Sequence, residues 1–200
     1  MIDLEIFNCE QGSESWFECR RAIPTASRFS DVLAKGQGIT RRKYLLTLAG
    51  EAITGEVAES YSNAHMERGH AMEADARNLY AFAHDVEPEL VGFMRRGRAG
   101  ASPDSLIGTD GLLEIKSKLP ALHLDVLEKN RMPPEHVAQV QGQLLVSGRQ
   151  FCDFVSYWPK LPLFCIRIER DETYITTLSQ AIADFVGELD TYIERYGVKA

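Results

Sequence analysis

The sequence lacks the segments that would place it in or across a membrane. None of its 200 residues belongs to an apolar run near the roughly 18 residues that a membrane-spanning helix needs. The first residues, Met-Ile-Asp-Leu-Glu, have neither the basic nor the apolar region of a signal peptide. We therefore expect an intracellular protein that has no membrane partner.

Cysteine is scarce and scattered. The four cysteines (Cys9, Cys19, Cys152 and Cys165) form no C-x-x-C pair. This spacing disfavours a disulfide scaffold, a zinc site and an iron–sulfur cluster. We expect the thiols to be core or incidental groups.

An excess of basic residues is also missing. Lys and Arg number 22 against 29 Asp and Glu, which gives a net charge of −7. Sequence-independent coating of nucleic acid relies on Lys and Arg facing phosphates, so this charge disfavours it. A basic groove in an acidic exterior is still compatible with the composition. At 44% hydrophobic and 26% charged residues, with no repeat or linker, residues 1–200 fit one globular domain.

Apolar spacing and turn residues predict the order of the elements. Helices are expected over 11–21, from 25 to a break at 36–38, and over 41–54, 63–83, 122–129, 135–147 and 173–196. Strands are expected over 90–94, in a hairpin within 101–116, and over 151–158 and 163–169. This order indicates an α/β or α+β domain with a central mixed sheet. In the helix over 63–83, Arg77 should lie on the solvent side and Glu73 near the apolar side.

The hairpin carries the first candidate site. Residues two apart in a strand share a face, so Glu114 and Lys116 should project together while Ile115 points into the core. Asp104, on the first strand, can meet them across the hairpin. Two carboxylates and one ammonium at one place suit a hard divalent cation with a lysine that handles developing charge. The alternative is an exposed hairpin with alternating charges.

Further polar residues fit such a site. Glu73 is a carboxylate on an otherwise small and apolar helix face, and Gln139 and Gln141 lie on the helix before the next core strand. A neutral amide can bond a metal-bound water or a phosphate without adding charge. The five histidines have no metal-ligand spacing, and we interpret them as structural: His65, His70, His84, His123 and His136.

Groups suited to an anion occur in two other segments. Arg20 supplies a guanidinium, and Thr25, Ser27 and Ser102 supply hydroxyls. Thr25 is expected to cap a helix, and helix N-termini attract anions.

Taken in order, these motifs resemble one family. The matching pieces are Trp16 with Arg20, Thr25-Ala-Ser27, Gly69 to Arg77 with Glu73, Ser102-Pro-Asp104, Leu113-Glu-Ile-Lys116, Ala138-Gln-Val-Gln141 and Ile168 to Asp171. They resemble the phage lambda exonuclease family of YqaJ-type viral recombinases, in the PD-(D/E)xK nuclease superfamily. Asp-x(n)-Glu-x-Lys alone is a weak pattern, whereas the ordered set spans most of the chain.

The resemblance implies a restriction-endonuclease-like fold, a central mixed sheet flanked by helices, with a helical N-terminal region. It implies a 5′→3′ exonuclease that digests one strand of linear double-stranded DNA to mononucleotides. The remaining 3′ single-stranded tail would pass to a single-strand annealing protein during recombination. The resemblance also implies a ring-shaped homotrimer in the cytoplasm of a bacterial or phage-infected cell.

Phosphodiester hydrolysis of this kind suggests two Mg²⁺ ions, with Mn²⁺ as a substitute. In this interpretation Asp104 bridges both ions, Glu114 and the Ile115 carbonyl complete the site that activates water, and Glu73 reaches the second ion. Lys116 orients or deprotonates the water, or stabilises the charge that it generates.

The remaining residues receive roles in substrate binding. Gln139 would hold the water or the scissile phosphate. Arg20, Ser27 and Ser102, together with Thr25, make a candidate pocket for the terminal 5′-phosphate.

Two more arginines and two alternative functions complete the sequence interpretation. Arg41 and Arg42 are candidates for contacts with the DNA backbone.

Two functions are alternatives to the exonuclease. One is a site-specific or structure-specific endonuclease that uses the same hairpin. The other is a degenerate nuclease fold that is kept as a DNA-binding scaffold.

Overall fold

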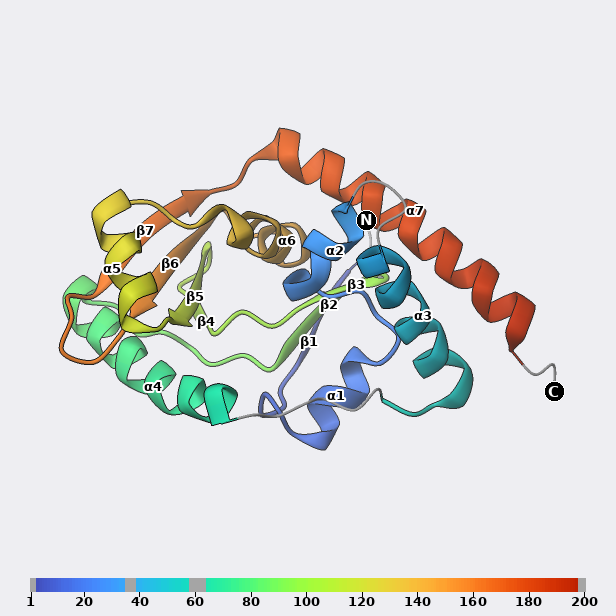
Figure 1. The fold of residues 1–200 in the computed structure, drawn as a ribbon, viewed down its shortest axis with the longest axis horizontal. Coiled ribbons are helices and arrows are strands. Elements are labelled where there is room, and N and C mark those ends of the chain that lie inside the picture. Colours follow the sequence, from blue (N-terminus) through green and yellow to red (C-terminus); the bar gives the residue numbers. More distant parts are fainter. Residues whose placement is uncertain (1–2, 35–38, 58–63, 198–200) are drawn as a thin grey trace.

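The computed structural model describes residues 3–34, 39–57 and 64–197, without the side chains of residues 64–71. The predicted mixed α/β class is confirmed, and helices form most of the N-terminal region (Figure 1). The strands belong to two sheets rather than to one central sheet.

The smaller sheet is antiparallel and has three short strands in the order β1-β2-β3. They are β1 Leu4–Phe7, β2 Phe93–Arg96 and β3 Ala99–Ala101. The sequence analysis missed β1 and β3, because strands of four and three residues are too short to show an alternating pattern. It also placed the middle strand a few residues too early.

The larger sheet carries the predicted hairpin. Its strands are β4 Ser105–Ile107, β5 Gly111–Ser117, β6 Phe151–Tyr157 and β7 Phe164–Glu169, in that order. β5 and β6 are parallel and the other pairs antiparallel, so this sheet is mixed as expected. The connection from β5 to β6 contains three helical segments, because parallel strands need a crossover.

The helices follow the expected order along the chain. They are α1 Glu14–Arg20, η1 Ala26–Arg28, α2 Phe29–Leu33, α3 Ile39–Thr54, α4 Ala64–His84, α5 Pro120–Lys129, η2 Pro134–His136, α6 Val137–Ser147 and α7 Glu172–Tyr196. Gly148, with φ of +79°, ends α6 in the left-handed conformation that glycine favours. The predicted break at 36–38 lies outside the described residues.

The larger sheet is covered on both faces. Leu113, Ile115 and Val155 pack on the α4 side, whereas Leu112 and Phe154 belong to the larger core on the other side. α6 lies in that larger core and packs against both sheets. In Figure 1, α4 runs below the larger sheet, while α7 runs along the opposite edge above α3.

Gly142 allows α6 to approach the N-terminal region closely. A Cβ atom at this position would lie 2.3 Å from the ring of Phe29 at the start of α2. Any larger residue would push α6 away from the segment that follows α1. The glycine therefore helps to set the distance between the N-terminal helices and the helix that faces β5.

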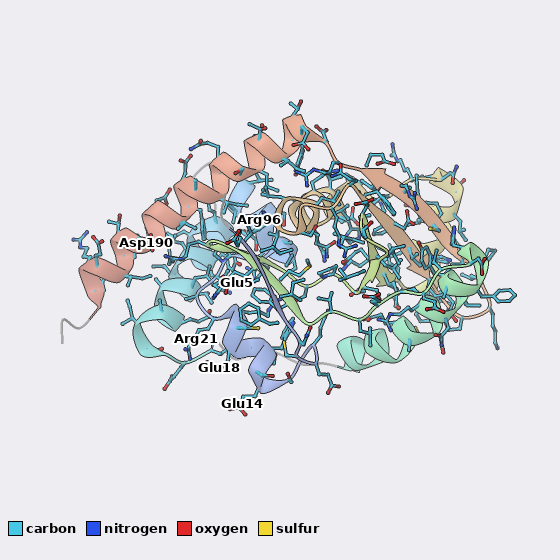
Figure 2. All side chains as sticks on the ribbon, turned by 180° about the vertical axis from the view of Figure 1, so that it is seen from behind. Glu5, Glu14, Glu18, Arg21, Arg96 and Asp190 are labelled. Carbon is cyan, nitrogen blue, oxygen red and sulfur yellow. The ribbon has the colours of Figure 1, made fainter. Side chains whose placement is uncertain are left out.

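The outer surface of α1 is acidic. Figure 2 shows Glu14 and Glu18 on the exposed side of this helix, with Arg21 beside them. Arg21 Nη1 lies 2.7 Å from a carboxylate oxygen of Glu18.

Among the described residues, no helix is long and apolar enough to cross a membrane.

The four cysteines are free thiols, with Cys152 buried and the others half-buried. The Sγ atoms of Cys9 and Cys19 lie 4.0 Å apart. The burial of Cys152 fits the interpretation of this thiol as a core group.

Candidate active site

Strand β5 sends its polar and apolar side chains to opposite faces, as the alternation predicts. Ile115 packs in the core beside α4, whereas Glu114 and Lys116 face α6. Glu114 is only 1% exposed. Lys116 Nζ lies 2.5 Å from Glu114 Oε1, which gives the buried carboxylate a cationic partner.

Helix α6 supplies two amides to the same carboxylate. Gln139 Nε2 donates to Glu114 Oε1 and Gln143 Nε2 donates to Glu114 Oε2, both at 2.6 Å. Residues four apart share a helix face, so a single face of α6 meets both oxygens. The sequence analysis missed Gln143, although its spacing from Gln139 was the available signal.

Gln141 lies apart from this group. Its Nε2 donates to the Glu169 carbonyl at 2.9 Å, and its Oε1 accepts from the Asp171 amide at 3.0 Å. Two residues along a helix amount to a rotation of about 200°, so Gln141 faces away from Gln139. The expectation that both amides serve one site is wrong for Gln141, which instead ties α6 to the start of α7.

Asp104 lies in a bend directly before β4, which begins at Ser105, so the prediction that Asp104 lies on the first strand is wrong by one residue. Its backbone amide donates to the Leu113 carbonyl at 3.0 Å, and its Oδ2 accepts from the Ile115 amide at 2.5 Å. Burial, together with the carboxylates of Glu114 and Glu73, raises the pKa of Asp104 well above its usual range. Asp104 is therefore close enough to feel the charge of both other carboxylates, and we call Glu73, Asp104 and Glu114 the carboxylate cluster.

The charge on Lys116 depends on this cluster. Burial opposes the ammonium form, yet the carboxylates of Glu114 and Asp104 hold the pKa of Lys116 above its usual range. Lys116 is therefore a cation in this arrangement.

Glu73 joins the cluster from α4 through an arginine. Arg77 Nη2 donates to Glu73, Arg77 Nε donates to Ser105 Oγ at 2.9 Å, and Arg77 Nη2 reaches the Asp104 carbonyl at 3.4 Å. The Arg77 side chain is only 15% exposed. The predicted solvent position of Arg77 is therefore wrong, because its guanidinium turns inward to bridge α4 and β4.

The donor chemistry of the carboxylate cluster suits a hard divalent cation. Its ligands are oxygens, and among the side chains that the structure describes, Lys116 pairs with Glu114 and Arg77 pairs with Glu73. However, no three His, Cys, Asp or Glu side chains within the described residues stand close enough to hold an ion as they are placed. Glu114 is occupied by amides and Lys116, and Glu73 is bonded to Arg77.

The candidate anion-binding residues also lie together. Arg20 Nη1 donates to Ser102 Oγ at 3.1 Å and Nη2 to Thr25 Oγ1 at 3.5 Å, while the Thr25 and Ser27 hydroxyls lie 3.4 Å apart. We call these four residues the Arg20 cluster. Thr25 occupies the N-cap position of η1, but its side chain makes no capping bond.

A tryptophan supports the Arg20 cluster. The guanidinium carbon of Arg20 lies 3.8 Å from the centre of the Trp16 ring. Trp16 Nε1 also donates to Ser102 Oγ at 2.9 Å and to the Gly92 carbonyl at 3.2 Å. Burial lowers the pKa of Arg20 to about 10, so the residue remains cationic near neutral pH. The sequence analysis matched Trp16 to a motif without recognising these contacts.

The other basic candidates stand apart from both clusters. Arg41 makes two bonds of 2.7 and 2.8 Å to the carboxylate of Glu188 on α7, which also raises the pKa of Arg41. Arg42, the next residue, is exposed. A contact with DNA therefore remains a prediction for both, and the ion pair makes Arg41 the less available of the two.

The histidines whose side chains the structure describes contact other side chains, although His84 is exposed. His123 is buried and bonded to Ser156 and to the Pro162 carbonyl, His84 packs on Tyr80, and His136 stacks on Phe154. These contacts agree with a structural interpretation. The side chains of His65 and His70 lie outside the described residues.

The fold defines the class of protein, because it matches solved exonucleases. An alkaline exonuclease from Laribacter hongkongensis, LHK-Exo, shares 36% sequence identity with this chain over 92% of this chain and 95% of its own. The TM-score is 0.85 for its complex with dAMP and 0.84 for a second structure. A phage-related exonuclease from Haemophilus somnus 129PT is 12% identical, with a TM-score of 0.67 over 86% of this chain and 96% of its own, and so shares the fold.

The sequence narrows this class to a family. Residues 15–150 match the YqaJ-like viral recombinase domain, whereas no curated protein matches the chain. The chain belongs to the YqaJ-like viral recombinase family, as the ordered motifs predicted. It is therefore a nuclease of the alkaline exonuclease and viral recombinase type.

Proposed function

We propose that this protein is a Mg²⁺-dependent 5′→3′ exonuclease that digests one strand of linear double-stranded DNA to mononucleotides. One observation carries the proposal: a cation-attracting cluster and an anion-attracting cluster meet in one segment. Ser102 belongs to the Arg20 cluster, and Asp104, two residues later, belongs to the carboxylate cluster. An enzyme that holds a terminal phosphate beside the bond that it cuts needs this proximity.

The carboxylate cluster would hold the metal ions. Asp104 would bridge two ions, Glu114 and the Ile115 carbonyl would complete one site, and Glu73 would serve the other. Bound divalent ions would supply Lewis acidity and a nucleophilic water at neutral pH. Because Glu114 and Glu73 are now bonded to other side chains, both carboxylates would have to exchange part of these bonds for the ions.

The residues around Glu114 would prepare the reacting groups. Lys116 is a cation beside Glu114, so it suits the stabilisation of developing negative charge. Its alternative role as a base requires loss of a proton that the neighbouring carboxylates disfavour. The amide of Gln139, a half-exposed residue, donates to Glu114. The same amide could also donate to the attacking water or to the scissile phosphate.

The Arg20 cluster would choose the end of the DNA. A guanidinium with three hydroxyl groups suits a terminal phosphate, which carries more negative charge than an internal one. A strand held by its 5′-phosphate presents the next linkage to the carboxylate cluster, and each cut releases one nucleotide. LHK-Exo, whose crystals contained dAMP, supports a mononucleotide product.

The family resemblance extends the proposal to the cellular setting. Residues 1–200 would act as one domain within a ring-shaped homotrimer around the DNA. The 3′ single-stranded tail would pass to an annealing protein in the cytoplasm of a bacterial or phage-infected cell. Of the two arginines at the start of α3, Arg42 is the better candidate for the DNA backbone, because Arg41 is paired with Glu188.

A linear duplex labelled at its 5′ end tests the proposal. With Mg²⁺, and with the 5′ end of the complementary strand capped, we expect the label to appear first as a 5′-mononucleotide, the complementary strand to stay intact, and EDTA to stop the reaction. A duplex with capped 5′ ends and a covalently closed circle should both resist digestion.

The other outcomes separate the alternatives. Cutting of the closed circle would identify an endonuclease. A folded protein that binds DNA without digesting any of these substrates would identify a degenerate scaffold. Release of label from the 3′ end first would reverse the proposed polarity.

A further inference from the structure

We propose that Arg77 is a positioning residue that holds Glu73 beside Asp104 and thereby controls the binding of the second metal ion. The inference rests on the proposed function, because it concerns the same carboxylate cluster. It assigns a role to a residue that the metal-ligand pattern does not include.

The contacts of Arg77 join the two segments that carry Glu73 and Asp104. On α4, its guanidinium is bonded to Glu73, four residues earlier. On the hairpin, Nε donates to Ser105 Oγ at 2.9 Å, and Ser105 Oγ in turn donates to the Asp104 carbonyl at 2.6 Å. Since α4 and β4 belong to different layers of the fold, this bridge determines how far Glu73 stands from Asp104.

The chemistry of the bridge requires an arginine. A guanidinium has five donors in a rigid plane, and here the donors serve acceptors on two elements. A lysine ammonium could pair with Glu73, but it lacks the planar set of donors with which the guanidinium also donates to Ser105. The bonds to Ser105 and Asp104 would anchor Arg77 even when Glu73 turns toward an ion.

The charge of Arg77 also explains how the cluster is tolerated. Glu73, Asp104 and Glu114 are all acidic, and acidic groups that are held together repel one another. Lys116 is the cation beside Glu114, and Arg77 is the cation bonded to Glu73. Each cation therefore stabilises one carboxylate near Asp104, and removal of Arg77 would take away the bridge between the hairpin and the carboxylate that serves the second ion.

The number of bound Mn²⁺ ions tests this role, and the measurement does not depend on DNA cleavage. The protein is mixed with a 5′-phosphorylated duplex whose terminal linkages are phosphorothioates, and bound Mn²⁺ is measured by electron paramagnetic resonance. We expect two ions per chain in the wild type. In Arg77→Met the weaker ion should bind at least roughly tenfold less tightly, as for other residues that orient metal ligands.

Matched variants isolate the effect of position. Glu73→Gln should lose the same ion, and the double variant Arg77→Met/Glu73→Gln should lose no more than either single variant. Arg77→Lys should restore binding only in part, and Ser105→Ala should weaken it by a smaller factor. Arg98→Met makes the same change of charge at the exposed pair with Asp190 and should leave both ions bound.

Each other outcome contradicts one claim. If the wild type binds no Mn²⁺, the proposed metal-dependent function fails, and the inference fails with it. If the wild type binds two ions and Arg77→Met binds them equally well, the inference alone is wrong. Should Arg77→Met not fold, Arg77→Lys and Ser105→Ala decide, and wild-type affinity in both would overturn the inference.

Discussion

The carboxylate cluster and the Arg20 cluster meet at Ser102 and Asp104 but are built in opposite ways. The first concentrates negative charge and holds it with amides and two cations. The second concentrates positive charge, and its guanidinium rests on the Trp16 ring and against hydroxyl groups.

The difference teaches how each cluster can be recognised. Buried carboxylates need many donors, so their partners come from α4 and α6 as well as from the hairpin. A buried arginine can be stabilised by an aromatic face and neutral oxygens, which leaves its charge available to an anion. The first cluster should therefore govern catalysis, and the second should govern the choice of DNA end.

The largest expected effect is loss of catalysis from the first cluster. Asp104→Ala should lower Mg²⁺-dependent digestion by roughly a thousandfold, about 4 kcal/mol of activation free energy, because it removes the proposed bridging ligand. Release of labelled nucleotide from a linear duplex measures the effect, and circular dichroism checks the fold. Asp110→Asn, an exposed acid in the same hairpin, should digest DNA normally, and normal digestion by Asp104→Ala would remove the metal assignment.

The next effect concerns the Arg20 cluster. Arg20→Met should reduce the preference for a 5′-phosphoryl over a 5′-hydroxyl end by roughly 30-fold, because a charged hydrogen bond contributes about 2 kcal/mol. Competition between two labelled duplexes measures the preference. Arg21→Met, which changes the adjacent arginine paired with Glu18 (Figure 2), should keep it. An unchanged preference in Arg20→Met would exclude Arg20 from end recognition.

A smaller effect is expected from the amides of α6. Gln143→Leu should slow digestion by roughly tenfold, because Glu114 loses one of its two amide donors in a buried position. Gln141→Leu removes an amide of the same helix that faces α7, so it should lower the melting temperature and leave digestion near the wild-type rate. Equal rates in the two variants would contradict the distinction between these faces.

The smallest effect is expected on the far face of the larger sheet. Tyr80 donates to Asp153 at 2.6 Å, and Tyr80→Phe should lower the free energy of unfolding by about 1.5 kcal/mol. Burial alone would raise the pKa of Asp153, but hydrogen bonds from Arg167 and Tyr80 hold it below its usual range. A carboxyl with a lowered pKa stabilises the fold above its usual pKa of 3.8 and loses that contribution as the pH falls through the folded pKa.

Thermal melts across acidic and neutral pH check this prediction. The gap between wild type and Tyr80→Phe should be largest near neutral pH and should shrink in acid. Digestion should change less than threefold, because the bond braces α4 without touching either cluster. A large loss of digestion would show that the two faces of the sheet are coupled.

Much of the fold followed from local patterns. The amphipathic spacing of residues 173–196 and the alternation in residues 111–117 correspond to α7 and β5. The short strands β1 and β3 escaped prediction, because they form only when β2 lies between them. The same limit applies to Arg41 and Glu188, which are 147 residues apart in the chain and meet through packing of α3 on α7.

What the sequence by itself determined is the facing of side chains within each element. The strand period places Glu114 and Lys116 on one face and Ile115 on the other, and the helix period places Gln139 with Gln143. Tertiary structure alone decided which faces meet: α6 against β5, Arg20 against Ser102, and Arg77 against Ser105. The physical reason is range, because a backbone period acts over a few residues, whereas these contacts require distant segments to be brought together by burial of the core.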